Sequence, residues 1–243
     1  MSTSQLEPNV ALEAPALTPP RRERWIDLLF VLAIVLWRPI FASTMYVLHW
    51  VSTSSNDSNL RVFDQMLAEA AGVAVLVYVL RKRNASIDEL TRRPEWQDIP
   101  RALMLYIGTC IAAAAAWYPI NFVSYVAVGH YPAHAQVGQL LGMQATVIWL
   151  VFQFVNPWYE ELIVRGFLMT ELSALTGVRT AVIASTLVQV SYHLYQGWMN
   201  ATAVGVIFLI FSIYYARTRR LLPIIIAHTL QDVLALMFYL HHR

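Results

Sequence analysis

The sequence predicts an all-α polytopic membrane protein with about seven to eight transmembrane helices and a polar cavity within the bilayer. Of its 243 residues, 58% are hydrophobic and only 13% are charged. The mean hydropathy is +0.50, a value that soluble domains of this length rarely reach. Long apolar runs recur at the length of about 20 residues that a helix needs to cross a bilayer, without the alternation typical of strands.

The apolar runs divide the chain into a short tail and one membrane domain. Residues 1–24 are polar and proline-bearing, and we predict a disordered cytoplasmic tail there. Residues 25–243 are predicted to form a single transmembrane helical domain. The first run is too long for the apolar part of a signal peptide, so we expect a retained anchor. The spans are expected at about 25–51, 62–81, 101–128, 138–173, 179–196, 199–216 and 221–240.

The fourth of these segments, 138–173, is too long to cross a bilayer of about 30 Å as one straight helix. Proline inside a helix removes a backbone hydrogen bond and bends or breaks the helix. We therefore expect Asn156 and Pro157 to kink this segment or to divide it into two helices.

Basic residues alternate between the loops and give the orientation. Arginines and lysines gather in the tail, between spans two and three, and after spans four and six, whereas the loops SSNDSN, GHYPAHAQ and YQGWMN carry none. Because cytoplasmic loops are enriched in Lys and Arg, this pattern predicts a cytoplasmic N-terminus, seven crossings and an external C-terminus.

The charge and cysteine content exclude other kinds of partner. The net charge of +2 comes from basic residues at the ends of apolar runs, where they set orientation, so no nucleic-acid partner is expected. The single cysteine, Cys110, excludes an intrachain disulfide framework and a cysteine-based zinc site.

Two adjacent carboxylates lie in the apolar stretch WYEELIVRGFLMTEL at 158–172. Glu161 and Arg165 are four residues apart on a helix, so they are expected to form a structural ion pair on one face. Glu160 points about 100° away from that pair. It is left as a carboxylate without a local partner, and is therefore a candidate for proton transfer.

Two histidines in later apolar runs can meet Glu160. These are His193, and His228 with Asp232 one turn further on. Counting about 1.5 Å per helical residue from the cytoplasmic ends places all four groups roughly 10–20 Å deep. A single histidine in an apolar helix is more often a packing residue, but a cluster of intramembrane ionisable groups indicates a functional site.

These residues carry a resemblance to a known family. The run EELIVRGFL resembles the EExxxRG signature of the CPBP family of membrane proteins, which includes CAAX endopeptidases and bacterial abortive-infection or bacteriocin-immunity homologues. The second motif, FxxxH, falls on Gln189–His193, and the third, HxxxN or HxxxD, on His228–Asp232. The resemblance covers the region of about 138–240. Gln189 replaces the usual phenylalanine, at a position that is not expected to take part in the chemistry.

The resemblance implies a glutamate-dependent intramembrane endopeptidase without a cofactor. Glu160 and His193 are expected to activate a water molecule, and His228 with Asp232 to stabilise the oxyanion, with Glu161 and Arg165 in support. The implied partners are the lipid bilayer and a membrane-anchored or hydrophobic peptide substrate. Prenylated CAAX tails are implied only for the eukaryotic branch, and the short form here indicates a bacterial inner (plasma) membrane.

Three alternatives remain open from the residues alone. One glutamate, two histidines and an aspartate can also ligate zinc, although the chain has no HExxH motif. A non-catalytic membrane immunity or binding protein of the same fold would retain the helices without cleaving a substrate. A transporter with a polar site at the midplane would need the internal repeats that this sequence lacks.

A second pair of charges lies in the first two spans. Arg38 and Glu69 are both about 20 Å from the cytoplasmic ends of their helices. We expect them to pair across the two helices, because an unpaired charge in hydrocarbon costs several kcal/mol. The alternative is that Arg38 faces the cavity and binds a substrate carboxylate.

Overall fold

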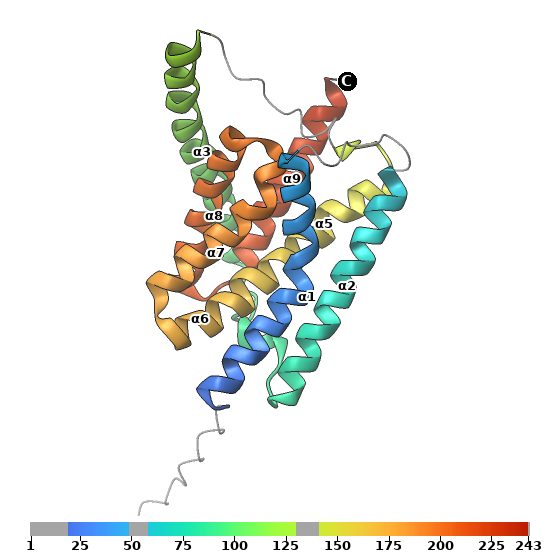
Figure 1. The fold of residues 1–243 in the computed structure, drawn as a ribbon, viewed down its shortest axis with the longest axis vertical. Helices are drawn as coiled ribbons and strands as arrows, with labels where there is room; N and C mark the ends of the chain where they lie inside the picture. The colour runs from blue at the N-terminus through green and yellow to red at the C-terminus, as the bar shows by residue number, and fades with distance from the viewer. Residues whose placement is uncertain (1–18, 49–57, 130–140, 243) are drawn as a thin grey trace, which may run out of the picture.

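The computed structural model describes residues 19–48, 58–129 and 141–242, and within these ranges every regular element is helical (Figure 1). Short helices other than the α-helices are a 3₁₀ turn at Ile87–Leu90, a π-helix at Leu162–Leu168 and a 3₁₀ turn at Leu194–Gln196. The α-helices are α1 (Arg21–Val47), α2 (Ser58–Lys82), α3 (Asp98–Val128), α5 (Val147–Glu161), α6 (Met169–Thr176), α7 (Val178–His193), α8 (Trp198–Thr218) and α9 (Leu222–His241).

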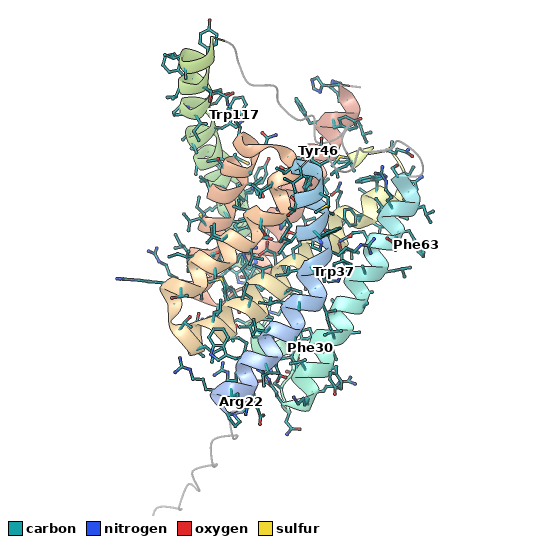
Figure 2. The ribbon with its side chains drawn as sticks, in the orientation of Figure 1. Arg22, Phe30, Trp37, Tyr46, Phe63 and Trp117 are labelled. Atoms are coloured by element: carbon teal, nitrogen blue, oxygen red, sulfur yellow. The ribbon has the colours of Figure 1, made fainter. Side chains whose placement is uncertain are left out.

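Five of the described helices are long and apolar enough to cross a membrane, namely α1, α2, α3, α8 and α9. The two other predicted crossings correspond to α7 and to the continuous helical stretch formed by α5, the π-helix and α6. Large apolar side chains such as Trp37 and Phe63 are exposed on the outer sides of α1 and α2 (Figure 2). This outward-facing apolar surface is what a lipid environment requires, and the chain is an integral membrane protein.

The helices pack into one bundle around the stretch from α5 to α6. Helix α8 packs against both α3 and α7, and α9 packs against α3 and α5, while α1 and α2 pair along one side. In Figure 1 the C-terminal half of α3 (green) projects past the ends of its neighbours. The centre of the bundle is therefore built mainly by the second half of the chain, which contains all the motif residues.

The fourth predicted segment differs from its expected form. The described α-helix begins at Val147 rather than at 138, and residues 130–140 lie outside the described ranges. The α-helix runs unbroken through Asn156 and Pro157, so the predicted division at these residues is wrong. One missing N–H does not end this helix, because α2 and α9 hold it from either side. The helix type changes five residues later, at Leu162.

Ion pairs join the N-terminal end of α1 to the C-terminal end of α2 and to α6. The Asp27 carboxylate accepts hydrogen bonds from Lys82 at 3.2 Å and from Arg83 at 2.8 Å. Arg83 also pairs with Glu171 at 3.1 Å, and Glu171 accepts a further bond from Arg24 at 2.9 Å. These contacts join α1, α2 and α6. Arg24 lies inside α1, which begins at Arg21, so the predicted tail is shorter by these four residues, and residues 1–18 lie outside the described ranges.

The predicted pairing of Arg38 with Glu69 is wrong. Arg38 instead forms an ion pair with Asp64, and 41% of its side chain is exposed. Glu69 is buried and accepts a hydrogen bond from Gln65 Nε2 at 3.0 Å, one turn earlier on α2. The depth estimate says nothing about the direction in which each side chain leaves its helix. An exposed Arg38 also does not fit the alternative of a carboxylate-binding residue inside a cavity.

Candidate active site

The centre of the bundle contains a buried cluster of ionisable side chains from α5, the π-helix and α9. Glu161 and Arg165 are both 0% exposed, and Arg165 Nη1 donates to Glu161 Oε1 at 3.3 Å. His228 Nδ1 lies 2.9 Å from the same oxygen. One carboxylate oxygen thus accepts from both a guanidinium and an imidazole, as the i, i+4 spacing of Glu161 and Arg165 predicts for the first of these contacts.

The π-helix at Leu162–Leu168 begins directly after Glu161 and contains Arg165. Single π turns inside α-helices are rare and occur often at functional sites. From this segment Arg165 Nη2 reaches the backbone carbonyl of Phe208 on α8 at 3.3 Å, and its guanidinium lies 4.7 Å from the centre of the Phe208 ring. Arg165 is therefore held by a carboxylate, a carbonyl and an aromatic face.

Glu160 has a different environment from its neighbour, because it is only half-buried. Its Oε1 accepts a hydrogen bond from Asn156 Nδ2 at 3.1 Å. Its Oε2 accepts one from Gln189 Nε2 at 3.2 Å and one from the Tyr192 hydroxyl at 3.0 Å. The expectation that Glu160 lacks a local partner is thus wrong. These partners are all uncharged, and no cation among the described residues neutralises Glu160 in the way that Arg165 neutralises Glu161.

His193, at the C-terminal end of α7, is linked to Glu160 through Gln189. The Nδ1 atom of His193 lies 2.8 Å from the Gln189 backbone carbonyl, while the side-chain amide of the same glutamine donates to Glu160. Because a carbonyl oxygen can only accept, Nδ1 carries the proton, and Nε2 of the neutral ring is left as an acceptor.

The Phe208 ring lies between the two histidines of the motifs. Its centre is 5.3 Å from the His193 ring centre and 5.3 Å from that of His228. Phe208 is buried and packs against both imidazoles. The two histidines therefore share one aromatic neighbour, although they come from α7 and α9.

Asp232 lies one turn after His228 on α9, with its Oδ2 3.8 Å from His228 Nε2. This distance is longer than a hydrogen bond. His228 is thus flanked by a carboxylate on each side of its ring, with the closer contact to Glu161 and the longer one to Asp232.

A surface pocket next to α7 includes none of the four predicted catalytic residues. One pocket of about 320 Å³ is apolar and lies between α7 and α8, where it is lined by Val190, Leu194, Ala201 and Gly205 among others. The polar cavity expected at the site stays a prediction. Within the described ranges, no group of three His, Cys, Asp or Glu side chains has an arrangement that would hold a metal ion.

Sequence reasoning missed several of the residues that surround the motif side chains. Asn156 lies four residues before Glu160, a spacing that indicates contact on a helix. Gln189 was noted only as a departure from the motif. Tyr192 and Phe208 gave no signal, because an aromatic residue in an apolar helix is usually a packing residue. Their contacts with the site depend on how α7 and α8 pack against α5.

Similarity to known proteins bears on the same part of the chain. Residues 142–234 match the family described as type II CAAX prenyl endopeptidase Rce1-like. This match is consistent with the CPBP resemblance inferred from the three motifs, and it spans the helices from α5 to α9 that carry them. No curated protein and no solved structure is significantly similar to this chain.

Proposed function

We propose that this chain, with its Rce1-like region at 142–234, is an intramembrane endopeptidase of the glutamic type. It hydrolyses a peptide bond of a membrane-anchored or hydrophobic substrate, using a water molecule that Glu160 and His193 activate. His228 and Asp232 act on the developing oxyanion, and Glu161 with Arg165 holds His228 in position. We further propose that it acts in a bacterial inner membrane with its N-terminus in the cytoplasm.

The observation that carries this proposal is the contrast between the two adjacent glutamates. Glu161 is fully buried and bound by Arg165 and His228. Glu160 is half-buried and is oriented by neutral donors, including Gln189. A carboxylate that is held in place, without a cation to neutralise it, is suited to accept a proton from water.

The proposed role of His193 follows from its hydrogen bond to the Gln189 carbonyl. With Nδ1–H occupied, Nε2 can accept a hydrogen bond from the attacking water. When the tetrahedral intermediate breaks down, the proton that Glu160 took from water passes to the leaving amine, either directly or through His193. The atoms balance without a cofactor, since water supplies both the hydroxyl of the new acid and the proton of the amine.

The proposed role of His228 depends on its second nitrogen. Nδ1–H faces Glu161 at 2.9 Å, so only the imidazolium can also donate through Nε2–H to an oxyanion. Glu161 and Asp232 supply the two negative charges that compensate the imidazolium and Arg165 in this low-dielectric site. A donor aimed at a tetrahedral oxygen is typically worth about 3 kcal/mol of transition-state stabilisation.

The test is cleavage of a library of lipidated and unlipidated hydrophobic peptides by the full chain reconstituted in vesicles. Glu160→Gln and His193→Ala are each expected to lower the rate by about 10²- to 10⁴-fold, at unchanged protein levels. The matched control is Glu23→Gln, an exposed glutamate on α1, which is expected to keep the full rate. Cleavage by Glu160→Gln at the rate of the unaltered chain would contradict the proposal.

A further inference from the structure

A second polar site lies at the opposite end of α8 from His193, outside the proposed active site. A pocket of about 390 Å³ is formed by the segment before α3, the first turn of α3 and the last turns of α8. Its volume lies at the lower end of the range of about 300–1,000 Å³ that small-ligand pockets occupy. The residues that give it its charge are Arg92, Glu95, Arg101, Arg217 and Arg220.

Two of the four arginines are matched by two carboxylates. Arg220 donates to Glu95 at 2.7 Å and to Asp98 at 2.7 Å, and it is largely buried. Arg101 donates to the same two carboxylates, at 3.2 Å and 3.1 Å. These bonds fix the inner wall of the pocket and hold the start of α3 against the end of α8. They leave no carboxylate over for the other two arginines.

Arg92 and Arg217 form the exposed part of the pocket. Neither side chain forms an ion pair with any residue in the described ranges. The hydroxyl of Tyr214 also lines the pocket and is buried. The pocket thus carries an excess of two positive charges together with a hydroxyl that can donate, a combination that fits an anion with several oxygen atoms.

The pocket lies at the boundary between the apolar and the polar parts of the surface. Trp96, in the segment that borders the pocket, is 77% exposed, and Ile99 in the first turn of α3 is 67% exposed. Exposed tryptophan and aliphatic side chains at the end of an apolar helix are typical of the membrane–water interface. Basic pockets between transmembrane helices at this level bind the phosphate groups of lipid heads.

We infer that this pocket is a binding site for a phosphate-bearing anion, in which Arg92 and Arg217 pair with phosphate oxygens and the Arg101–Arg220 wall gives the site its shape. Two sources can present this chemistry, the head group of an anionic phospholipid and soluble inorganic phosphate. The site is independent of the proposed peptidase activity, because none of its residues belongs to the cluster around Glu160.

The experiment measures the thermal unfolding midpoint of the full chain in a neutral detergent. Short-chain phosphatidylglycerol, short-chain phosphatidylcholine and inorganic phosphate are each added in turn. A ligand that binds only the folded state raises the midpoint, by about 5 °C at a concentration well above its Kd. We expect phosphatidylglycerol or phosphate to give this rise and phosphatidylcholine to give none. A rise with phosphatidylglycerol alone assigns the site to lipid, and an equal rise with phosphate assigns it to the soluble anion.

The deciding variant is the double substitution Arg92→Gln with Arg217→Gln, which is expected to lose at least half of the rise. Its matched control is Arg81→Gln with Arg179→Gln, which removes the same charge from exposed positions outside the pocket and is expected to keep the full rise. The midpoint without ligand reports whether each variant folds. The single substitution Arg217→Gln is the milder variant to measure if the double variant does not fold. Equal loss in both double variants, or no rise in the unaltered chain with either anion, would overturn the inference.

Discussion

His228 Nδ1 lies 2.9 Å from Glu161 Oε1, so the histidine of α9 binds the carboxylate that Arg165 also binds, and not the neighbouring Glu160. Removing this carboxylate would leave a guanidinium without its counter-charge in a site that is 0% exposed. We expect Glu161→Gln to lower the free energy of unfolding by about 3–5 kcal/mol, as breaking a buried ion pair typically does.

The measurement for Glu161→Gln is reversible unfolding of the purified chain in detergent. Glu23→Gln serves as the control, because Glu23 is exposed and its substitution is expected to change the unfolding free energy by less than about 0.5 kcal/mol. If Glu161→Gln were as stable as this control, the buried pair would contribute nothing to the fold.

Tyr192 orients Glu160 through a single hydroxyl, which lies 3.0 Å from Oε2. If Glu160 is the general base, Tyr192→Phe is expected to lower kcat by about 10- to 100-fold, since a hydrogen bond to a charged group contributes about 1.5–3 kcal/mol. KM should change little, because the hydroxyl orients the base and does not bind substrate. Tyr78→Phe, at an exposed position on α2, is the control and should leave both constants unchanged. A change in KM alone would assign Tyr192 to substrate binding instead.

Helices α1, α2 and α5 meet closely at Gly72. A Cβ atom at this position would lie 3.0 Å from both Cε2 and the hydroxyl oxygen of Tyr159, and 3.3 Å from Val35 Cγ2. Gly72→Ala is therefore expected to lower stability by about 1–3 kcal/mol through overpacking. A Cβ at Gly108 on α3 would meet no atom within 4 Å, so Gly108→Ala is expected to stabilise the helix by up to about 1 kcal/mol. Thermal unfolding of both variants tests whether Gly72→Ala lowers the stability and Gly108→Ala raises it.

Glu95, in the segment before α3, gives the stability a dependence on pH. The hydrogen bond from Arg220, and then that from Arg101, lower the pKa of Glu95 below its ordinary value of 4.5. A lowered pKa means that the stabilisation is fully present above pH 4.5 and is lost as the pH falls through the lower folded-state pKa.

Glu95→Gln is accordingly expected to be less stable than the unaltered chain at pH 7, with a difference that shrinks towards the lowest pH at which the chain stays folded. The unfolding midpoint measured at intervals from neutral to acid pH reports this difference. Asp88→Asn, which changes an exposed carboxylate outside the arginine cluster, should give a difference that does not vary with pH in this way. A constant difference for Glu95→Gln would show that its ion pairs do not form.

The helical class and the order of the elements could be predicted because they depend on local composition. Apolar runs bounded by basic loops gave α1, α2, α3, α8 and α9 to within a few residues. The π-helix at Leu162–Leu168 could not be predicted, because the difference between i→i+4 and i→i+5 bonding is set by how neighbouring helices pack on the turn. Pro157 does not divide the helix, because tertiary contacts keep the helix continuous around it.

For the site, contacts within one helix were predictable and most of those between helices were not. The spacing of Glu161 and Arg165 sufficed to predict their bond. The error at Arg38 and Glu69 shows the limit of such counting: depth along a helix is known from the sequence, but rotation about the helix axis is not. Arg38 pairs with Asp64 instead of Glu69. The partners of Glu160 on α7 were missed because the sequence does not give the rotation of each helix about its axis.

The π-helix has a consequence for insertions and deletions in this chain. It joins Glu161 to α6, whose Glu171 forms ion pairs with Arg24 and Arg83. The π turn accommodates about one residue more than ordinary helical winding does, so loss of one residue between 162 and 168 would leave the angle between α5 and α6 nearly unchanged. Loss of Met169 or Thr170, in the ordinary winding of α6, would instead turn Glu171 by about 100° away from both arginines. The π-helix is thus the place between the buried charges and Glu171 where a change in length of one residue disturbs their relative orientation least.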